Sequence, residues 1–282
     1  MTKKIIPFAL VGIFFLSFQA CKDHSKNTLK IDGSSTVLPP VSASAEAYKS
    51  LKPELNIVLN AGGSGVGVNL LGSGKIDIGM SSRDITAEEK AQFPNCDFKV
   101  HNIGKDAVVP VVSNEVYESG VTALTLAQIT SIYSGEVNNW KEFGGFDKEI
   151  LCIDKEKSRG TRHVFMKVVT GDKMFDAPGA DLVLGSNNEE QTAISQGDAS
   201  IGMLSLAWIN EEAKGLSVII QGDTIDPTIE NLVNGSFPIS RSLDLLTNGN
   251  PQGEIKDFID FLLNTEGQKL VEQAGYVKIK KL

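Results

Sequence analysis

Apolar and polar positions follow two alternating periods along the chain, one typical of short strands and the other of amphipathic helices. Strand-like apolar runs occur at 29–32, 55–60, 76–80, 98–103, 107–112, 150–153, 200–204 and 216–220. Helix-like segments lie between them, including 37–51, 66–71, 161–169 and 255–263. Strands that alternate with helices predict an α/β architecture of packed layers. The run at 107–112 is continuously apolar, which is typical of a buried strand.

Four helix starts carry the signature of a capping box, a Ser or Thr followed three residues later by Glu or Gln. In this motif the hydroxyl accepts a hydrogen bond from the backbone three residues on, and the Glu or Gln side chain accepts one from the cap residue's own amide. The four pairs are Thr86 with Glu89, Thr125 with Gln128, Ser186 with Glu189, and Thr265 with Gln268. We expect a helix to begin at each of them.

Three turns rich in Gly, Ser and Thr each precede a predicted helix, at 32–36, 62–67 and 158–162. A helix N-terminus offers unpaired backbone N–H groups and the positive end of the helix dipole. Glycine lets a ligand approach the backbone closely, and Ser or Thr adds a hydroxyl donor. Any one turn could be an ordinary helix cap. The three together, with Arg159 and Arg162 beside the third, predict a cage for one small oxyanion.

Composition narrows the class of function. The chain has 282 residues, 41% of them hydrophobic, enough for one large domain or two compact ones. Its net charge is −8 and no basic stripe is present, which argues against nucleic-acid binding.

Motifs for nucleotide binding and catalysis are missing from the sequence. The turn at 62–69 matches neither a Walker A loop nor a dinucleotide fingerprint. The three histidines, His24, His101 and His163, show no metal-ligand spacing, and no nucleophile–base pair is evident. We expect no enzyme, cofactor or metal.

The N-terminus has the pattern of a targeting segment. Lys3 and Lys4 precede an apolar stretch at 5–18, and small Ala20 precedes Cys21. This predicts a signal peptide over 1–20, a lipidated Cys21 and a polar tether over 21–27, with a plainly secreted protein as the alternative. No later apolar run approaches the ~20 residues of a membrane span, which predicts a soluble body held at an extracytoplasmic or periplasmic membrane face.

Two further cysteines, Cys96 and Cys152, fall in different predicted domains. A secreted chain could join them in a disulfide. We favour two buried thiols, because a bridge would restrict motion between the domains.

The order of several short motifs resembles one family. They are Gly-Ser-Ser-Thr at 33–36, Gly-Gly-Ser-Gly at 62–65, Asp-Ile-Gly-Met-Ser-Ser-Arg at 77–83, Tyr-Ser-Gly at 133–135 with Trp140, Gly-Thr-Arg at 160–162, and Pro-Ile-Ser-Arg at 238–241. Together they resemble the phosphate-binding lipoproteins of ABC-type phosphate uptake. The resemblance implies a two-domain type II periplasmic-binding-protein fold with a two-strand hinge, crossing near 105–109 and 238–242. Domain one would be 28–106 plus 240–282, and domain two 107–239.

The resemblance also implies a ligand set. The phosphate-binding residues would be Ser34, Ser35, Thr36, Ser64, Ser82, Arg83, Lys155, Ser158, Arg159, Gly160 and Thr161. The anion would be enclosed by hinge closure, and a membrane permease would recognise the closed monomer.

Two departures from the family pattern leave selectivity open. Lys155, Ser158 and Arg159 replace Arg, Gly and Ser of the family motif, and Lys cannot form the bidentate fork of Arg. Ser82 stands where long-chain members place an Asp that accepts the proton of phosphate; Asp84 and Glu156 are candidate substitutes. Sulfate, molybdate or tungstate binding therefore remains an alternative, as does a sensor or adhesion role. A phosphatase is disfavoured by the missing catalytic set, and Arg162 is expected at the surface.

Overall fold

A computed structural model describes residues 27–279 of the chain. The expected signal peptide, Cys21 and most of the tether lie outside the described residues, as does the charged end of the C-terminal tail. Within 27–279, no helix combines the length and hydrophobicity that a bilayer crossing requires.

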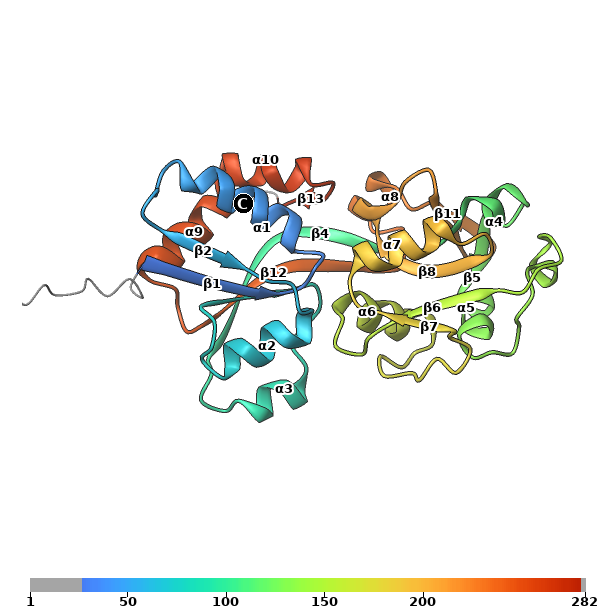
Figure 1. The fold of residues 1–282 in the computed structure, drawn as a ribbon, viewed down its shortest axis with the longest axis horizontal. Helices are drawn as coiled ribbons and strands as arrows, with labels where there is room; N and C mark the ends of the chain where they lie inside the picture. Colours follow the sequence, from blue (N-terminus) through green and yellow to red (C-terminus); the bar gives the residue numbers. More distant parts are fainter. Residues whose placement is uncertain (1–26, 280–282) are drawn as a thin grey trace, which may run out of the picture.

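The structure has two lobes joined by two long strands, β4 (Phe98–Ser113) and β12 (Ser240–Asn248) (Figure 1). Lobe one begins with β1 (Thr28–Gly33), α1 (Leu38–Lys49), β2 (Asn56–Leu59), α2 (Ser64–Gly72), β3 (Ile78–Ser81) and α3 (Ala87–Gln92). The chain returns to it for α9 (Gly253–Leu263), α10 (Thr265–Gln273) and β13 (Val277–Lys278).

Lobe two holds the elements between the two crossing strands. They are α4 (Asn114–Glu118), β5 (Ala123–Thr125), α5 (Leu126–Tyr133), η2 (Trp140–Phe143), β6 (Leu151–Lys155), α6 (Gly160–Val169), β7 (Leu182–Leu184), α7 (Asn187–Gln196), β8 (Ser200–Ser205), η3 (Leu206–Trp208), β9 (Ala213–Gly215), β10 (Ser217–Ile220), β11 (Asp223–Ile225) and α8 (Ile229–Val233). The predicted α/β alternation is confirmed in both lobes.

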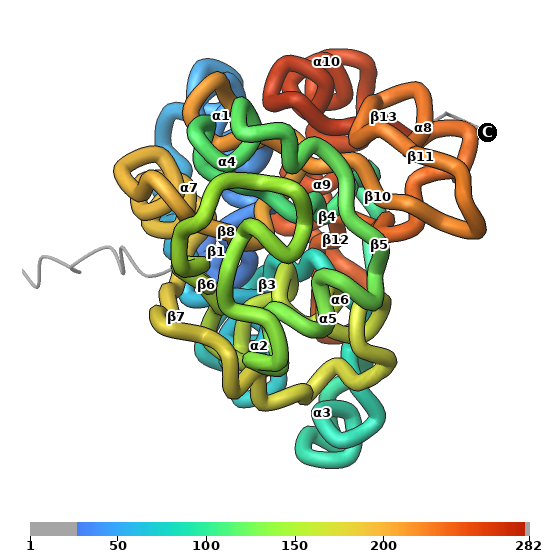
Figure 2. The backbone as a smooth tube through the Cα atoms, turned by 90° about the vertical axis from the view of Figure 1, so that its right-hand side faces the viewer, coloured from blue at the N-terminus to red at the C-terminus, as the bar shows by residue number. Residues whose placement is uncertain are grey.

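One sheet runs through both lobes in the order β2-β1-β3-β12-β4-β8-β6-β7, with β13 and β9 also paired to β4. β1 pairs in parallel with β2 and β3, and β6 pairs in parallel with β7 and β8. Between these parallel parts, β4 and β12 run antiparallel, and they lie side by side in both views (Figures 1 and 2). A separate three-stranded sheet, β11-β10-β5, belongs to lobe two.

Each lobe has its own core. Lobe two packs around the apolar part of β4 with Trp140, Phe165 and Met203, all fully buried. Lobe one packs β1 and β12 against α1 and α9, where Tyr48 meets the rings of Phe258 and Phe261. Trp140 also donates to the backbone oxygen of Ala199.

The sequence predicted two strands at 98–103 and 107–112, and this was wrong: they form the single strand β4. The polar run Gly104-Lys105-Asp106 resembles a turn but is the crossing between the lobes. Gly104 lies so close to β13 that a Cβ there would approach the Val277 oxygen to 2.9 Å. Asp106 is buried because β12 supplies a cation for it, a partner that local sequence cannot show.

Three of the four predicted capping boxes form as expected, at Thr86, Thr125 and Ser186. The fourth helix, α10, also begins at the predicted residue Thr265, but no capping box forms there. Asn264 is the cap of α10, accepting from the amides of Glu266 and Gly267, and Thr265 is already helical. Gln268 instead donates to backbone oxygens of Ile103 and Leu262. Cys96 and Cys152 are free thiols, Cys152 buried and Cys96 half-buried.

Candidate anion-binding site

The three Gly/Ser/Thr turns meet between the lobes. Those before α1 and α2 come from lobe one, and the one before α6 comes from lobe two. A small cavity is lined by residues from all three, namely Ser34, Ser35, Thr36, Gly63, Ser64, Arg159, Gly160 and Thr161, together with Lys155, Gly185 and Asn187. The expectation that these turns converge on one place is therefore confirmed.

The hydroxyl groups at this cavity hydrogen-bond to one another. Ser34 donates to Ser82 over 2.9 Å, and Ser64 lies 3.3 Å from the same Ser82 oxygen. Across the gap between the lobes, the hydroxyls of Thr36 and Thr161 lie 3.4 Å apart. All five side chains are at least 96% buried. An anion that enters must replace these mutual contacts, and each hydroxyl would then turn its hydrogen to the anion.

Arg241, on the crossing strand β12, donates hydrogen bonds to three of these hydroxyls. The sequence did not predict this role. One guanidinium nitrogen donates to Thr161 over 2.9 Å and to Ser82 over 3.3 Å, and the other to Thr36 over 3.1 Å. Asp106 on β4 accepts from Arg241 at 2.7 and 2.9 Å. Burial raises the pKa of Asp106, while the Arg241 guanidinium opposes that rise. Arg241 is the last residue of the motif Pro-Ile-Ser-Arg at 238–241, which is the one feature of the sequence that could have pointed to it.

Lys155 reaches the cavity as a fully buried side chain. Its ammonium pairs with Glu190 of α7 and donates to the backbone oxygen of Ser186 over 3.2 Å. Burial lowers the pKa of Lys155 and raises that of Glu190, and the attraction between the two charges opposes both shifts. The Lys155 ammonium is therefore held at the cavity wall, and the buried Glu190 carboxylate behind it balances its charge.

Other predicted site residues lie outside the cavity wall or already form hydrogen bonds or ion pairs with protein groups. The Arg83 guanidinium pairs with Glu89 at 2.6 Å and is absent from the cavity wall. Ser158 contacts lobe one through its backbone oxygen, which accepts from Gly65 over 3.0 Å. Arg159 does line the cavity, but Glu156 and the Ala61 oxygen hold its guanidinium.

The prediction that Arg162 lies at the surface was wrong. Arg162 is 1% exposed, its Nε lies 3.0 Å from each carboxylate oxygen of Asp154, and it donates to the backbone oxygen of Phe175. Its position in α6 turns the side chain into the lobe, so that this cation anchors α6 to β6.

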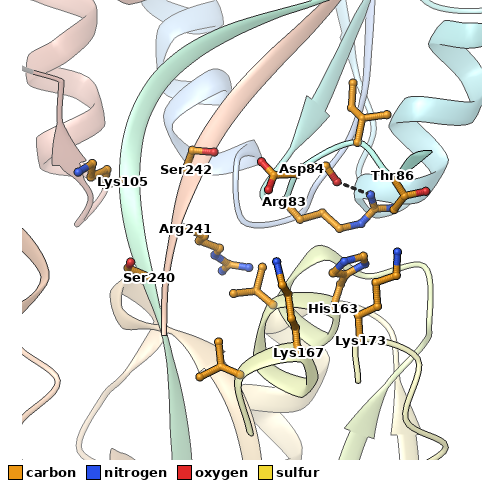
Figure 3. Close-up of a pocket in the computed structure, with 13 residues that line it drawn as sticks. Arg83, Asp84, Thr86, Lys105, His163, Lys167, Lys173, Ser240, Arg241 and Ser242 are labelled. Carbon is orange, nitrogen blue, oxygen red and sulfur yellow. Dashed lines mark hydrogen bonds between the residues drawn. The ribbon is translucent and has the colours of Figure 1, made fainter. Parts of the chain in front are cut away.

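A larger groove of about 590 Å³ lies between the lobes on the α3 and α6 side. Figure 3 shows Arg83 and Asp84 on one side and His163 and Lys167 of α6 on the other, with Arg241 of β12 beside them. Asp84 accepts from Arg83 only through its backbone oxygen. Burial, together with the nearby charges of Arg83 and Lys173, lowers the pKa of His163 to about 4.

This low pKa predicts a pH effect on stability. The unfolded chain takes up a proton on His163 near its ordinary pKa of 6.5, whereas the folded chain does so only near 4. Stability therefore falls as the pH drops from 6.5 towards 4. Allowing for the partial exposure of His163, we expect it to contribute about 1 kcal/mol of the loss between pH 7 and pH 5. In urea denaturation at both pH values, His163→Gln should lose less stability than the unsubstituted protein; equal losses would contradict the assignment.

Within residues 27–279 there is no cluster of three or more His, Cys, Asp or Glu side chains that could hold a metal ion. The side-chain donors that line the cavity are hydroxyls, an amide, the Lys155 ammonium and the Arg159 guanidinium, and Arg241 hydrogen-bonds to the hydroxyls; such groups are suited to an oxyanion.

Comparisons with known proteins agree with this geometry. The model of the PBP superfamily domain matches residues 20–266. The phosphate-binding protein PstS of Borreliella burgdorferi is 31% identical over 99% of both chains, and that of Bacillus subtilis is 29% identical over 98% of this chain and 94% of its own. A putative phosphate ABC transporter substrate-binding protein from Clostridium perfringens, solved with bound phosphate, superposes with a TM-score of 0.80 at 33% identity, covering 90% of this chain and all of that one. The chain therefore belongs to the PBP superfamily and, within it, to the family of the phosphate-binding proteins PstS.

Proposed function

We propose that this protein captures inorganic phosphate outside the cytoplasm and delivers it to the membrane permease of an ABC transporter. One observation carries the proposal: buried hydroxyls from both lobes, Ser34, Thr36, Ser64 and Thr161, line one cavity. Ser82 and Arg241 lie behind them and hydrogen-bond to them. The named relatives are phosphate-binding proteins, and one was solved with phosphate bound.

The donors suit a small, highly charged ligand. A hydrogen bond to a charged group contributes about 1.5–3 kcal/mol, so eight or more at the upper figure would together exceed the tightest non-covalent affinities, about 18–21 kcal/mol. Stripping water from the anion and ordering the two lobes offset most of this gain. The N-terminus of α6, whose first residues Gly160 and Thr161 are buried at the cavity, adds its dipole to the side-chain donors.

Hinge closure is the proposed mechanism. Domain one (28–106 plus 240–282) would bind phosphate first through its hydroxyls, and domain two (107–239) would then close and add Thr161, Gly160 and the Lys155 charge. Contacts that already cross between the lobes support this, among them Gly65 to the Ser158 oxygen at 3.0 Å and Asn187 to Thr36 at 3.0 Å. The permease would recognise the closed shape. We further propose a monomer, anchored to the membrane through a lipid on Cys21.

Calorimetric titration of residues 22–282, stripped of bound anion, tests the proposal. We expect phosphate to bind, and the double variant Ser64→Ala with Thr161→Ala to bind it well over tenfold more weakly, because two charge-assisted hydrogen bonds are lost. Unchanged affinity in the double variant would refute the site. Displacement by sulfate, molybdate or tungstate would indicate a general oxyanion receptor, and no binding at all would favour a sensor or adhesion role.

Closure itself can be tested at Gly160. A Cβ at this position would lie 2.3 Å from the Ser64 hydroxyl and 2.5 Å from that of Ser82, both on the opposite lobe. Gly160→Ala should therefore fold normally but close poorly, with phosphate affinity lowered about tenfold or more. Titration measures the affinity and thermal melting checks the fold. A variant that binds as tightly as the unsubstituted protein would argue against closure at this contact.

A further inference from the structure

One acceptor at the cavity has no partner. Asn187, the first residue of α7, is 1% exposed, and its amide nitrogen donates to Thr36 over 3.0 Å. Its side-chain oxygen is buried and, within residues 27–279, accepts no hydrogen bond. A buried carbonyl oxygen left unpaired costs about 1–3 kcal/mol, so a ligand that donates to it recovers that cost. Asn187 also lines the cavity.

Among the buried side-chain oxygens that line the cavity within residues 27–279, Asn187 Oδ1 is the one without a hydrogen bond. Thr36 accepts from both Arg241 and Asn187. Neither Asp106 nor Glu190 is part of the cavity wall. Asp106 accepts from Arg241 and Ser205, and Glu190 accepts from the Met203 amide while pairing with Lys155.

The two carboxylates suggested by the sequence do not supply the acceptor either. The Glu156 carboxylate is held by Arg159 at 2.8 Å, and Asp84 lines the larger groove. Within residues 27–279, Asn187 Oδ1 is therefore the buried side-chain acceptor of the cavity wall that no protein group occupies.

Phosphate needs such an acceptor and sulfate does not. Near neutral pH phosphate still carries at least one P–OH hydrogen, which must be accepted when the anion is buried, whereas sulfate is fully ionised. We propose that Asn187 accepts this hydrogen through its side-chain oxygen and is a specificity-determining residue for phosphate over sulfate. This rests on the proposed function. An anion with no hydrogen would bring its negative oxygen against the carbonyl oxygen of Asn187, which is repulsive.

The test compares three tetrahedral anions, because arsenate keeps a hydrogen at neutral pH as phosphate does, and sulfate does not. Calorimetric titrations would use residues 22–282 with each anion, for the unsubstituted protein and for Asn187→Ala. Loss of the donor to Thr36 affects all three anions alike, so the readout is the ratio of sulfate to phosphate dissociation constants. We expect this ratio to fall about tenfold or more in Asn187→Ala, and the sulfate-to-arsenate ratio to fall equally.

Two further variants serve as controls for the change in these ratios. Asn188→Ala changes the exposed neighbour on the same helix and should leave the ratios unchanged. Asn187→Asp keeps an acceptor of the same shape and should hold the ratio at or above that of the unsubstituted protein. If Asn187→Ala weakens all three anions equally, or none, the inference is overturned. If the unsubstituted protein binds no phosphate, the proposed function itself fails, and that outcome is read before any variant is made.

Discussion

Replacing Arg241 with alanine is expected to weaken phosphate binding at least about a hundredfold, because several charge-assisted hydrogen bonds are lost together. Arg241 contacts Ser82 and Thr36 of lobe one and Thr161 of lobe two. It therefore hydrogen-bonds to both halves of the site and places a guanidinium directly behind its hydroxyls. Calorimetric titration with phosphate measures the loss.

The same substitution should also destabilise the fold. Asp106 is 1% exposed, and without Arg241 its carboxylate would remain buried and unpaired. Breaking a buried ion pair on one side costs about 3–5 kcal/mol. The matched control is Arg241→Met combined with Asp106→Asn, which removes both charges while the Asn side chain can still accept from Ser205. This double variant should regain most of the lost stability and still fail to bind phosphate. Tight binding by either variant would remove Arg241 from the site.

The second large effect is expected at the Lys155–Glu190 pair. Glu190→Ala leaves the Lys155 ammonium fully buried without its carboxylate, so the free energy of unfolding should fall by about 3–5 kcal/mol. Urea denaturation measures this. Lys155→Met combined with Glu190→Leu removes both charges and keeps the volume, and it should be far more stable than Glu190→Ala.

Asn188→Ala, an exposed change on the same helix, serves as the control and should alter stability by no more than about 0.5 kcal/mol. A Glu190→Ala protein as stable as this control would show that the pair does not hold a buried charge. The double variant should also bind phosphate more weakly, because the positive charge at the cavity wall is gone.

Local interactions made much of this fold predictable. The capping boxes at Thr86, Thr125 and Ser186 join residues three apart, so the sequence contains both partners. The three anion turns were predictable for the same reason, since Gly, Ser and Thr at a helix start have a local meaning. Their convergence followed from placing each turn at the carboxyl end of a strand in an α/β fold.

Contacts between residues far apart in the chain could not be predicted from the sequence. Arg162 resembles a surface charge until Asp154 is brought opposite to it, and the polar run at 104–106 resembles a turn until β12 pairs with it. Asp106 and Arg241 are 135 residues apart, so nothing near either one indicates the pair. Asn187 stands in an ordinary helix start, and only the folded cavity shows that its oxygen has no partner.

A crystal structure of residues 22–282 grown with arsenate would show where the anion binds, because anomalous scattering locates the arsenic atom. We expect one arsenic between the lobes, with its oxygens about 2.6–3.2 Å from the hydroxyls of Ser64 and Thr161 and from the guanidinium of Arg241. An arsenic found instead in the groove beside His163 and Lys167, with the hydroxyl cluster still bonded to itself, would contradict this expectation.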